Sequence, residues 1–404
     1  MQEKQVYIAR QPIVDINKNI ISYELLFRHN ATTEIAEFSD DLEASSNVMV
    51  NTLTALGSSW LDNKKAFINV STSMIDTGLL ELLPESNFIL EIDEASQQMP
   101  NVNEKIMAVK DKGFEISLDD FVPTENAIAI LQKAQYIKLD VLNNKKEVIE
   151  RIVKIANKYD IHPIAKKVET NEMFEWAKQI GFKSFQGFFF AKPETLKTTV
   201  LNPAYEIILT IMNKVRQGAE LKELEDWFKK DPGLSYKLFR YINSAGFGLT
   251  CEIQSLKHAI TVLGVKPLYK WLTLLLVTSA KSSSAPVAIK TAIIRGRLTE
   301  LLSKDLLSKQ DQDNLFIVGV FSLLDVILGI PLEKIVEKLS LPDTIIEALV
   351  HRHGIYGPFI SIAEACEKGD FVTLDTLATQ NLLDAGFINK CHLDAISWVE
   401  TLGV

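Results

Sequence analysis

Cysteine is scarce in this chain of 404 residues, which contains three: Cys251, Cys366 and Cys391. They lie far apart and none belongs to a CxxC pair, so the sequence has neither a disulfide framework nor the spacing of a structural zinc site. We therefore expect small buried side chains at all three positions, in a protein of a reducing compartment.

Long apolar runs and an excess of positive charge are also missing. The apolar run at residues 272–277 is far shorter than the ~18 residues of a membrane span. Residues 1–7 alternate polar and apolar side chains where a signal peptide needs a continuous apolar segment. Lys and Arg number 43 against 52 Asp and Glu, a formal net charge of −9, which disfavours binding to nucleic-acid phosphates. The sequence predicts a cytoplasmic protein with no membrane span and no nucleic-acid partner.

About the first half of the chain alternates short β-branched or aromatic runs with helical patterns, which is typical of βα units. The predicted strands are residues 67–70, 88–92, 114–118, 136–139, 162–165 and 184–188. Polar side chains stand at or near the ends of these runs: Asn69, Glu91, Asp119, Asp120, Lys138, Lys166, Glu169 and Gln186. In a TIM-like (β/α)8 barrel such ends meet at one mouth, where active sites are built. We predict such a barrel over residues 1–198, with a site at its mouth.

The second half of the chain shows helical periodicity alone. Pro203 after Asn202 and Pro232 after Asp231 are typical helix openings, and Ser255 is placed to cap a third helix that Gly264 ends. An apolar stripe predicts one buried helix face at Ile207, Ile208, Ile211, Met212 and Val215. We predict an all-helical domain over residues 199–404.

Oxygen-bearing side chains at the predicted mouth suggest a divalent-metal site, formed by Glu24, Asn69, Glu91, Asp119 and Asp120. Hard oxygen ligands suit Mg²⁺ or Mn²⁺, and a pair of metals can clamp a phosphodiester and generate hydroxide for in-line attack. From the residues alone, the alternative is that these acids are simply solvated at strand ends.

Short motifs in this half occur in a characteristic order. They are Gln11-Pro12-Ile13, Glu24-Leu25-Leu26 with Arg28, Asn69-Val70-Ser71, Glu91-Ile92-Asp93-Glu94, Asp119-Asp120-Phe121, Lys138-Leu139-Asp140, Val168-Glu169-Thr170 and Gln186-Gly187. Over about residues 1–195 this order resembles the EAL domains, barrel phosphodiesterases that open cyclic di-GMP to the linear dinucleotide.

The resemblance implies roles for these residues. Those matching the ligands of a first Mg²⁺ or Mn²⁺ are Glu24, Asn69, Glu91 and Asp119, and Asp119 and Asp120 would face a second metal. Lys138 matches the lysine that helps to hold the attacking water. The predicted ligand-binding residues, with cyclic di-GMP as the candidate ligand, are Gln11, Glu24, Arg28 and Gln186.

The most consequential departure from the family pattern is at Lys166. The family's Ala-Glu-Gly-Val-Glu-Thr segment is Ala165-Lys166-Lys167-Val168-Glu169-Thr170 here, so Lys166 replaces the glutamate that serves the second metal and is usually assigned as general base. A protonated ammonium cannot take a proton from water, and it repels a divalent cation. We predict that Lys166 points into the mouth and pairs with Asp119 or Asp120 instead.

Two further departures are the loop after Asp120, where the family's Gly-rich segment is Val122-Pro123-Thr124-Glu125-Asn126, and Leu25 in place of alanine. The first restricts a backbone that in the family shapes metal binding and dimer contacts. We predict an inactive barrel in which Lys138 and Glu169 are relics of the catalytic set. Metal-free binding of cyclic di-GMP remains open, beside a relic mouth or a protein-docking surface.

The helical half contains Asp231-Pro232-Gly233-Leu234, Leu238-Phe239-Arg240-Tyr241-Ile242-Asn243-Ser244-Ala245 and Ile253-Gln254-Ser255-Leu256-Lys257-His258-Ala259-Ile260. This series resembles the HDOD module, an output or scaffolding domain of bacterial signalling that shares the fold of HD phosphohydrolases without their metal site. None of the six histidines is followed by aspartate, so the doublet that a nucleotide hydrolase of that fold needs is absent.

The whole chain therefore resembles two-domain EAL–HDOD signalling proteins. We predict a bacterial protein that acts through contacts with a signalling protein partner and is gated by cyclic di-GMP if the nucleotide is bound. The alternative is an active, metal-dependent cyclic di-GMP phosphodiesterase. A homodimer remains open.

Overall fold

The computed structural model describes residues 7–28, 61, 64–71, 74–75, 80, 83–99, 101–121, 130–188, 203–243, 253, 255–279 and 286–402. Contacts divide the chain into two compact units. Unit 1 comprises Met1–Lys192, Ala285–Lys290 and Ser361–Val404, and unit 2 comprises Pro193–Ser284 and Thr291–Ile360. The division at residues 198 and 199 stays a prediction, and the units differ from it by grouping the last part of the chain with the barrel.

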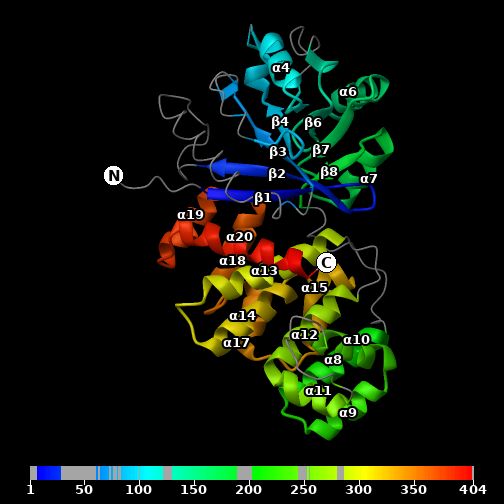
Figure 1. Cartoon of the computed structure of the whole chain (residues 1–404), viewed down its shortest axis with the longest axis vertical. Coiled ribbons are helices and arrows are strands. Elements are labelled where there is room, and N and C mark those ends of the chain that lie inside the picture. Colours follow the sequence, from blue (N-terminus) through cyan, green and yellow to red (C-terminus); the bar gives the residue numbers. More distant parts are fainter. Residues whose placement is uncertain are drawn as a thin grey trace. The chain divides into compact units, whose positions relative to one another are not determined.

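Unit 1 is built on a closed barrel of eight strands in chain order (Figure 1). The strands are β1 (Tyr7–Val14), β2 (Ile20–Arg28), β3 (Lys65–Asn69), β4 (Phe88–Ile92), β5 (Glu115–Leu118), β6 (Tyr136–Asp140), β7 (His162–Lys166) and β8 (Ser184–Gln186). Ile13, Phe67, Ile89 and Ile164 pack together inside it. The barrel prediction is confirmed, and the six predicted runs coincide with β3 to β8.

The first two strands form a hairpin that the predicted strands did not include. β1 pairs antiparallel with both β2 and β8, whereas the other neighbouring strands pair in parallel. The carboxylate of Asp15 accepts hydrogen bonds from the backbone N–H groups of Asn17 and Asn19, which closes the turn. Because β2 follows β1 so directly, no crossover helix is available to cover the outer side of β1.

Helices follow the later strands of the barrel. They are α3 (Glu94–Gln97), α4 (Val102–Asp111), α6 (Lys146–Lys158) and α7 (Asn171–Ile180). Thr170 caps α7 by accepting from the N–H of Met173, and Gly181 ends that helix in the left-handed conformation at φ 105°. These caps fix where β7 and β8 start and end, and so where their mouth residues lie.

The rest of the described chain is helical. The helices are α8 (Pro203–Arg216), α9 (Leu221–Lys229), α10 (Pro232–Ile242), α11 (Leu256–Leu263), α12 (Val265–Thr278), α13 (Pro286–Leu302), α14 (Lys309–Phe321), α15 (Leu324–Leu328), α16 (Leu332–Val336), α17 (Asp343–His351), α18 (Gly357–Lys368), α19 (Phe371–Gln380) and α20 (Ala385–Thr401). The all-helical prediction is confirmed for the described residues. Asp231 and Ser255 cap α10 and α11 as predicted, and Gly264 ends α11 at φ 78°.

Two details complete the comparison with the sequence. In the described part of the chain no single helix is long and apolar enough to cross a membrane, although α11 and α12, bent by 105°, have that length and composition as a pair. Cys366 and Cys391 are free and buried, as expected, whereas Cys251 lies outside the described residues.

Candidate functional site

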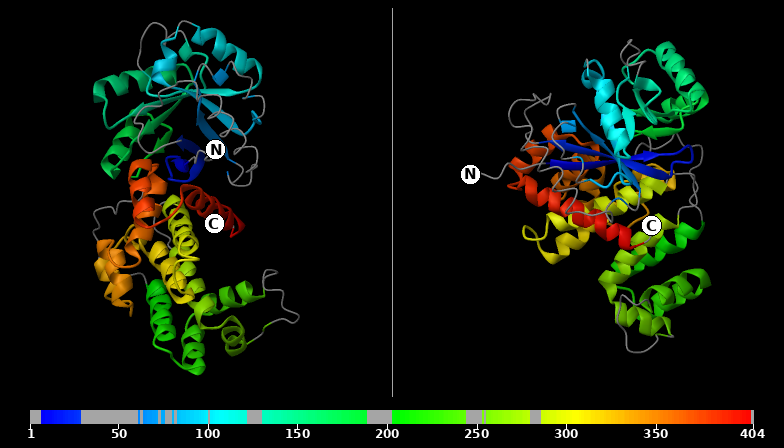
Figure 2. Two further views of the ribbon diagram at one scale, coloured as in Figure 1. Left: turned by 90° about the vertical axis from the view of Figure 1, so that its left-hand side faces the viewer. Right: turned by 45° about the horizontal axis from the view of Figure 1, so that its top comes forward.

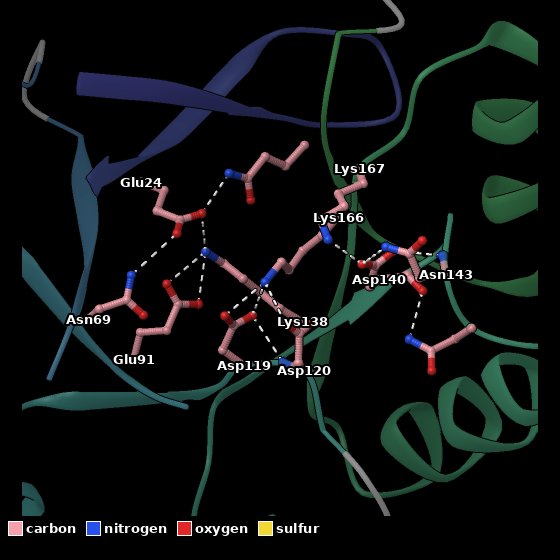
Figure 3. A network of polar contacts seen from close by, with 12 residues as sticks. Glu24, Asn69, Glu91, Asp119, Asp120, Lys138, Asp140, Asn143, Lys166 and Lys167 are labelled. Atoms are coloured by element: carbon pink, nitrogen blue, oxygen red, sulfur yellow. Dashed lines mark hydrogen bonds and ion pairs between the residues drawn. The ribbon is translucent and has the colours of Figure 1, made fainter. Parts of the chain in front are cut away.

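The mouth of the barrel gathers charged side chains from most of its strands (Figure 3). The strand register explains why, because Gln11 lies opposite Glu24, Asn69 opposite Glu91, and Asp140 opposite Lys166. Side chains that share a register position also share a level of the barrel. Two groups of residues result, which we name the inner cluster and the outer cluster.

The inner cluster consists of Glu24, Glu91, Lys138 and Gln186. The Lys138 ammonium lies 2.9 Å from Oε2 of Glu24 and 2.8 Å from Oε1 of Glu91, and its side chain is 0% exposed. Nε2 of Gln186 donates to the same Glu24 oxygen at 2.6 Å. Asn69 approaches the cluster from its exposed position, with Nδ2 at 3.5 Å from Oε1 of Glu24.

Burial determines the charge of the inner cluster. Burial raises the pKa of Glu91 to about 8, against the attraction of Lys138. Burial acts in the same direction on Glu24, but the ammonium groups of Lys138 and Lys166 hold its pKa below the ordinary value. Burial therefore favours the protonated form of Glu91, whereas Glu24 favours the carboxylate that balances the Lys138 charge.

The outer cluster consists of Lys166, Asp119 and Asp120. The Lys166 ammonium donates to Oδ1 and Oδ2 of Asp119 at 2.7 and 2.8 Å and to Oδ2 of Asp120 at 3.1 Å. Its side chain is 14% exposed. Burial lowers the pKa of Lys166, but Asp119 and Asp120 outweigh that effect and raise the pKa above its ordinary value. The predicted pairing of Lys166 with these two acids is confirmed.

The residues of the mouth do not fit a pair of divalent cations. Both oxygens of Asp119 and one of Asp120 accept hydrogen bonds from the Lys166 ammonium, which occupies the space that a cation shared by these acids would need. A positive charge at that distance also repels a divalent ion. Among the described residues, no three His, Cys, Asp or Glu side chains are arranged to hold a metal ion.

A second lysine, Lys167, makes an ion pair that sequence reasoning missed. Its ammonium lies 2.6 Å from Oδ2 of Asp140, and its backbone is left-handed at φ 56°. Asp140 also accepts from the N–H groups of Leu142 and Asn143. The family pattern has glycine at the Lys167 position, and that glycine is the one signal in the sequence for a left-handed backbone there.

Other predicted site residues lie at different distances from these clusters. Gln11 joins the inner cluster through Gln186, whose Nε2 donates to Oε1 of Gln11 at 2.8 Å. Glu169 lies between β7 and α7 and is exposed. The side chain of Arg28, at the end of β2, lies outside the described residues, as does the loop at residues 122–126.

Comparison with known proteins identifies the families of the two domains. Residues 1–193 match the family model of the EAL domain, and residues 201–324 match that of the HDOD domain. A Vibrio cholerae protein named cyclic di-GMP phosphodiesterase CdgJ is 28% identical, over 94% of this chain and 88% of its own length. The uncharacterized protein YuxH of Bacillus subtilis is 26% identical, over 98% of this chain and 99% of its own.

Solved structures that resemble the chain include a standalone EAL protein of Vibrio cholerae with bound c-di-GMP. It is 23% identical, with a TM-score of 0.39, and the match covers 48% of this chain and 93% of that one. Klebsiella pneumoniae BlrP1, in a complex with calcium and cy-diGMP, is 21% identical with a TM-score of 0.40. That match covers 47% of this chain and 56% of the BlrP1 chain.

Proposed function

Because the chain carries an EAL domain at residues 1–193 followed by an HDOD domain at residues 201–324, we propose that it is a signalling protein whose barrel does not hydrolyse cyclic di-GMP. In this proposal the helical domain passes the signal on through contacts with a protein partner. The nucleotide, where it binds, acts as a regulator and not as a substrate.

The contact between Lys166 and the acids of the outer cluster carries the proposal. Hydrolysis of a phosphodiester needs a group that takes a proton from the attacking water, and a protonated lysine has no lone pair for it. The acids that would hold a second metal are engaged by the same ammonium at 2.7 and 3.1 Å. Lys166 therefore takes the place of the general base and also repels a second metal ion.

Cyclic di-GMP is the ligand that we propose for the mouth. Its phosphates are anionic, and the partly exposed Lys166 ammonium can donate to them without a bound metal if it exchanges a bond to Asp119 or Asp120. Amide groups of Gln11 and Gln186, which lie within 2.8 Å of each other, can bond to polar atoms of a ligand. Binding needs these atoms only, whereas hydrolysis also needs a base.

The alternative function is an active phosphodiesterase. A specific observation favours it, because the relative that is 28% identical over 94% of this chain carries the name of a cyclic di-GMP phosphodiesterase. Glu24, Asn69, Glu91, Asp119 and Lys138 also remain in place. Under this alternative, a group other than residue 166 activates the water.

A hydrolysis assay on the purified full chain separates the two functions. With Mn²⁺ or Mg²⁺ we expect no linear dinucleotide by chromatography, and turnover of roughly 1 s⁻¹ or faster would establish the phosphodiesterase. Calorimetric titration should detect binding of cyclic di-GMP that does not depend on Mg²⁺. The double variant Lys166→Glu, Lys167→Gly should bind Mn²⁺ before it regains hydrolysis.

A matched control is the variant Lys183→Glu. It makes the same change of charge as the Lys166→Glu exchange within that double variant, in an ion pair with the fully exposed Asp160, at 3.7 Å. Because this pair precedes β8 and belongs to neither cluster, Lys183→Glu should leave the affinity for Mn²⁺ unchanged. Equal gains of Mn²⁺ binding in both variants would mean that net charge, and not Lys166, controls the metal.

A further inference from the structure

The last part of the chain belongs to the same unit as the barrel, although both family matches end before it. The HDOD match ends at residue 324, whereas Ser361–Val404 groups with the barrel. Helix α20 packs against β1, as Figures 1 and 2 show. This is the strand that has no helix of its own, so α20 supplies the missing outer layer.

Buried charges hold α20 to the barrel. Glu400 lies 3.7 Å from NH2 of Arg10, on β1, and 3.0 Å from the Lys290 ammonium, on α13. The side chains of Arg10 and Lys290 are buried, and the Arg10 guanidinium also stacks over the Tyr23 ring at 3.9 Å. A carboxylate shared by two buried cations fixes the position of its helix more closely than an exposed ion pair does.

The turn between α18 and α19, residues 368–370, reaches the rim of the mouth. The Lys368 carbonyl accepts a hydrogen bond from Nε2 of Gln11 at 2.7 Å. Ala9 and Leu26, which pair with each other across the β1–β2 hairpin, lie beside Gly369. Ala9, Gln11 and Ile13 lie on the same face of β1, and Ile13 packs inside the barrel. The turn therefore lies on the inward-facing side of the hairpin and contacts Gln11, the strand partner of Glu24.

Gly369 favours this placement of the turn. Its φ is 64°, and a Cβ added to it would lie 2.5 Å from Cδ1 of Leu26. The N–H groups of Gly369 and Asp370 close the end of α18 on the carbonyls of Cys366 and Ala365. The side chain of Asp370 then accepts from the N–H of Thr373 and starts α19.

We propose that this turn is a built-in competitor for the nucleotide. The inference rests on the proposed function, because Gln11 is a predicted ligand-binding residue whose amide is hydrogen-bonded to Gln186 and to the Lys368 carbonyl. A nucleotide that takes the Gln11 amide must displace the turn, so docking of the turn and occupancy of the mouth oppose each other. Helix α18, which ends in the turn, begins at Gly357 within unit 2, so the helix can carry the displacement toward the helical domain.

Hydrogen–deuterium exchange and calorimetry on the full chain test the competition. The variant Gly369→Ala should loosen the turn, and Gly218→Ala is the matched control because its φ is 75° and nothing lies within 4 Å of its added Cβ. We expect Gly369→Ala to bind cyclic di-GMP about fivefold more tightly than the wild type, the value of one hydrogen bond. Gly218→Ala should match the wild type. Cyclic di-GMP should also raise deuterium uptake of residues 361–380 in the wild type.

Equal affinity of the wild type and both variants, or protection of residues 361–380 by the nucleotide, would overturn the competition. If neither the wild type nor Gly369→Ala binds cyclic di-GMP, the proposed nucleotide binding fails, and exchange without nucleotide decides the inference. Faster exchange of residues 7–28 in Gly369→Ala than in Gly218→Ala then supports the docked turn, and equal exchange refutes it. If Gly369→Ala does not fold, Glu400→Gln serves as the second loosening variant, with the same readouts.

Discussion

The inner and outer clusters of the mouth both pair a lysine with acidic side chains, but they differ in how far water reaches them. Each places one lysine between two acids, but Lys138 is 0% exposed and Lys166 is 14% exposed. At the inner cluster, burial raises the pKa of Glu91 to about 8. At the outer cluster water reaches the charges, and Asp120 in particular is 41% exposed.

This difference in exposure indicates which lysine is harder to replace without loss of stability. An ion pair without access to water is difficult to dismantle, because each partner left behind is a buried charge. A pair that water reaches can be exchanged at lower cost, and the residue there is free to change function. Lys138 is the lysine shared with the EAL pattern and Lys166 is the departure from it, as this reasoning predicts.

The largest expected effect is loss of stability in Lys138→Met. Glu24 would remain buried without its ammonium, and we expect unfolding free energy to fall by about 3–5 kcal/mol, measured by urea denaturation. Lys166→Met is the matched variant, and it should lose only about 1–2 kcal/mol because water reaches its acids. Equal losses in the two variants would remove the distinction between a structural inner cluster and an exchangeable outer cluster.

The second prediction concerns Lys166→Glu, which places three acids together at the outer cluster. Repulsion among them should lower the unfolding free energy by about 2 kcal/mol in a metal chelator. Saturating Mn²⁺ should restore about that amount, since a ligand at 100 times its Kd stabilises by about 2.7 kcal/mol. Thermal unfolding with and without Mn²⁺ measures both values. If Mn²⁺ does not change the melting temperature of this variant, Lys166 alone does not exclude the metal.

The third prediction uses the opposite end of β7, where His162 begins the strand that Lys166 ends. Burial, with a contribution from Lys183, lowers the pKa of His162 to about 4, and its Nε2 lies 2.6 Å from Oγ of Ser184. Between pH 6.5 and 4, His162 is therefore protonated in the unfolded chain but neutral in the folded chain. Stability is therefore complete above pH 6.5 and is lost as the pH falls toward 4.

Because this histidine is partly exposed, the loss is discounted to about 1–2 kcal/mol. Other acids of the chain also change protonation as the pH falls, so the comparison is between the wild type and His162→Gln, which keeps a polar group near Ser184. The difference in unfolding free energy between the two should change with pH between 6.5 and 4. A constant difference would mean that His162 titrates normally in the folded chain.

The sequence predicted the parts of the site that depend on local pattern. Strands β3 to β8 appear as short apolar runs, and the end of each run marks a mouth residue. The pairing of Lys166 with Asp119 could be predicted because both positions end barrel strands and their charges are opposite. Composition and order along the chain are enough for such inferences.

The missed features depend on contacts between distant residues or on backbone shape. Pro12 lies within β1 although proline is unusual in a strand, and the turn of the hairpin carries its signal in Asp15, Asn17 and Asn19, without glycine. Gln11 and Lys368 are separated by 357 positions, and no local pattern predicts that the α18–α19 turn lies at the mouth. The Lys167–Asp140 pair depends on a left-handed lysine, which propensity argues against.

The smallest expected effect concerns Lys167, where the strain of a left-handed backbone and the ion pair with Asp140 act in opposite directions on stability. Changing Lys167→Gly should relieve about 1 kcal/mol of left-handed strain but remove an ion pair to Asp140 whose lysine is 50% exposed, worth about 0.5 kcal/mol. Glycine also adds roughly 0.5 kcal/mol of unfolded-state entropy, so the changes nearly cancel.

Asp160→Gly is the matched control, since Asp160 has φ 55° and its side chain is 100% exposed, with Lys183 3.7 Å away. We expect unfolding free energy to change by less than about 0.5 kcal/mol in Lys167→Gly and to rise slightly in Asp160→Gly, by urea denaturation of the two variants in parallel. A clear loss in Lys167→Gly alone would show that the pair with Asp140 holds the end of β7, and with it Lys166, in place.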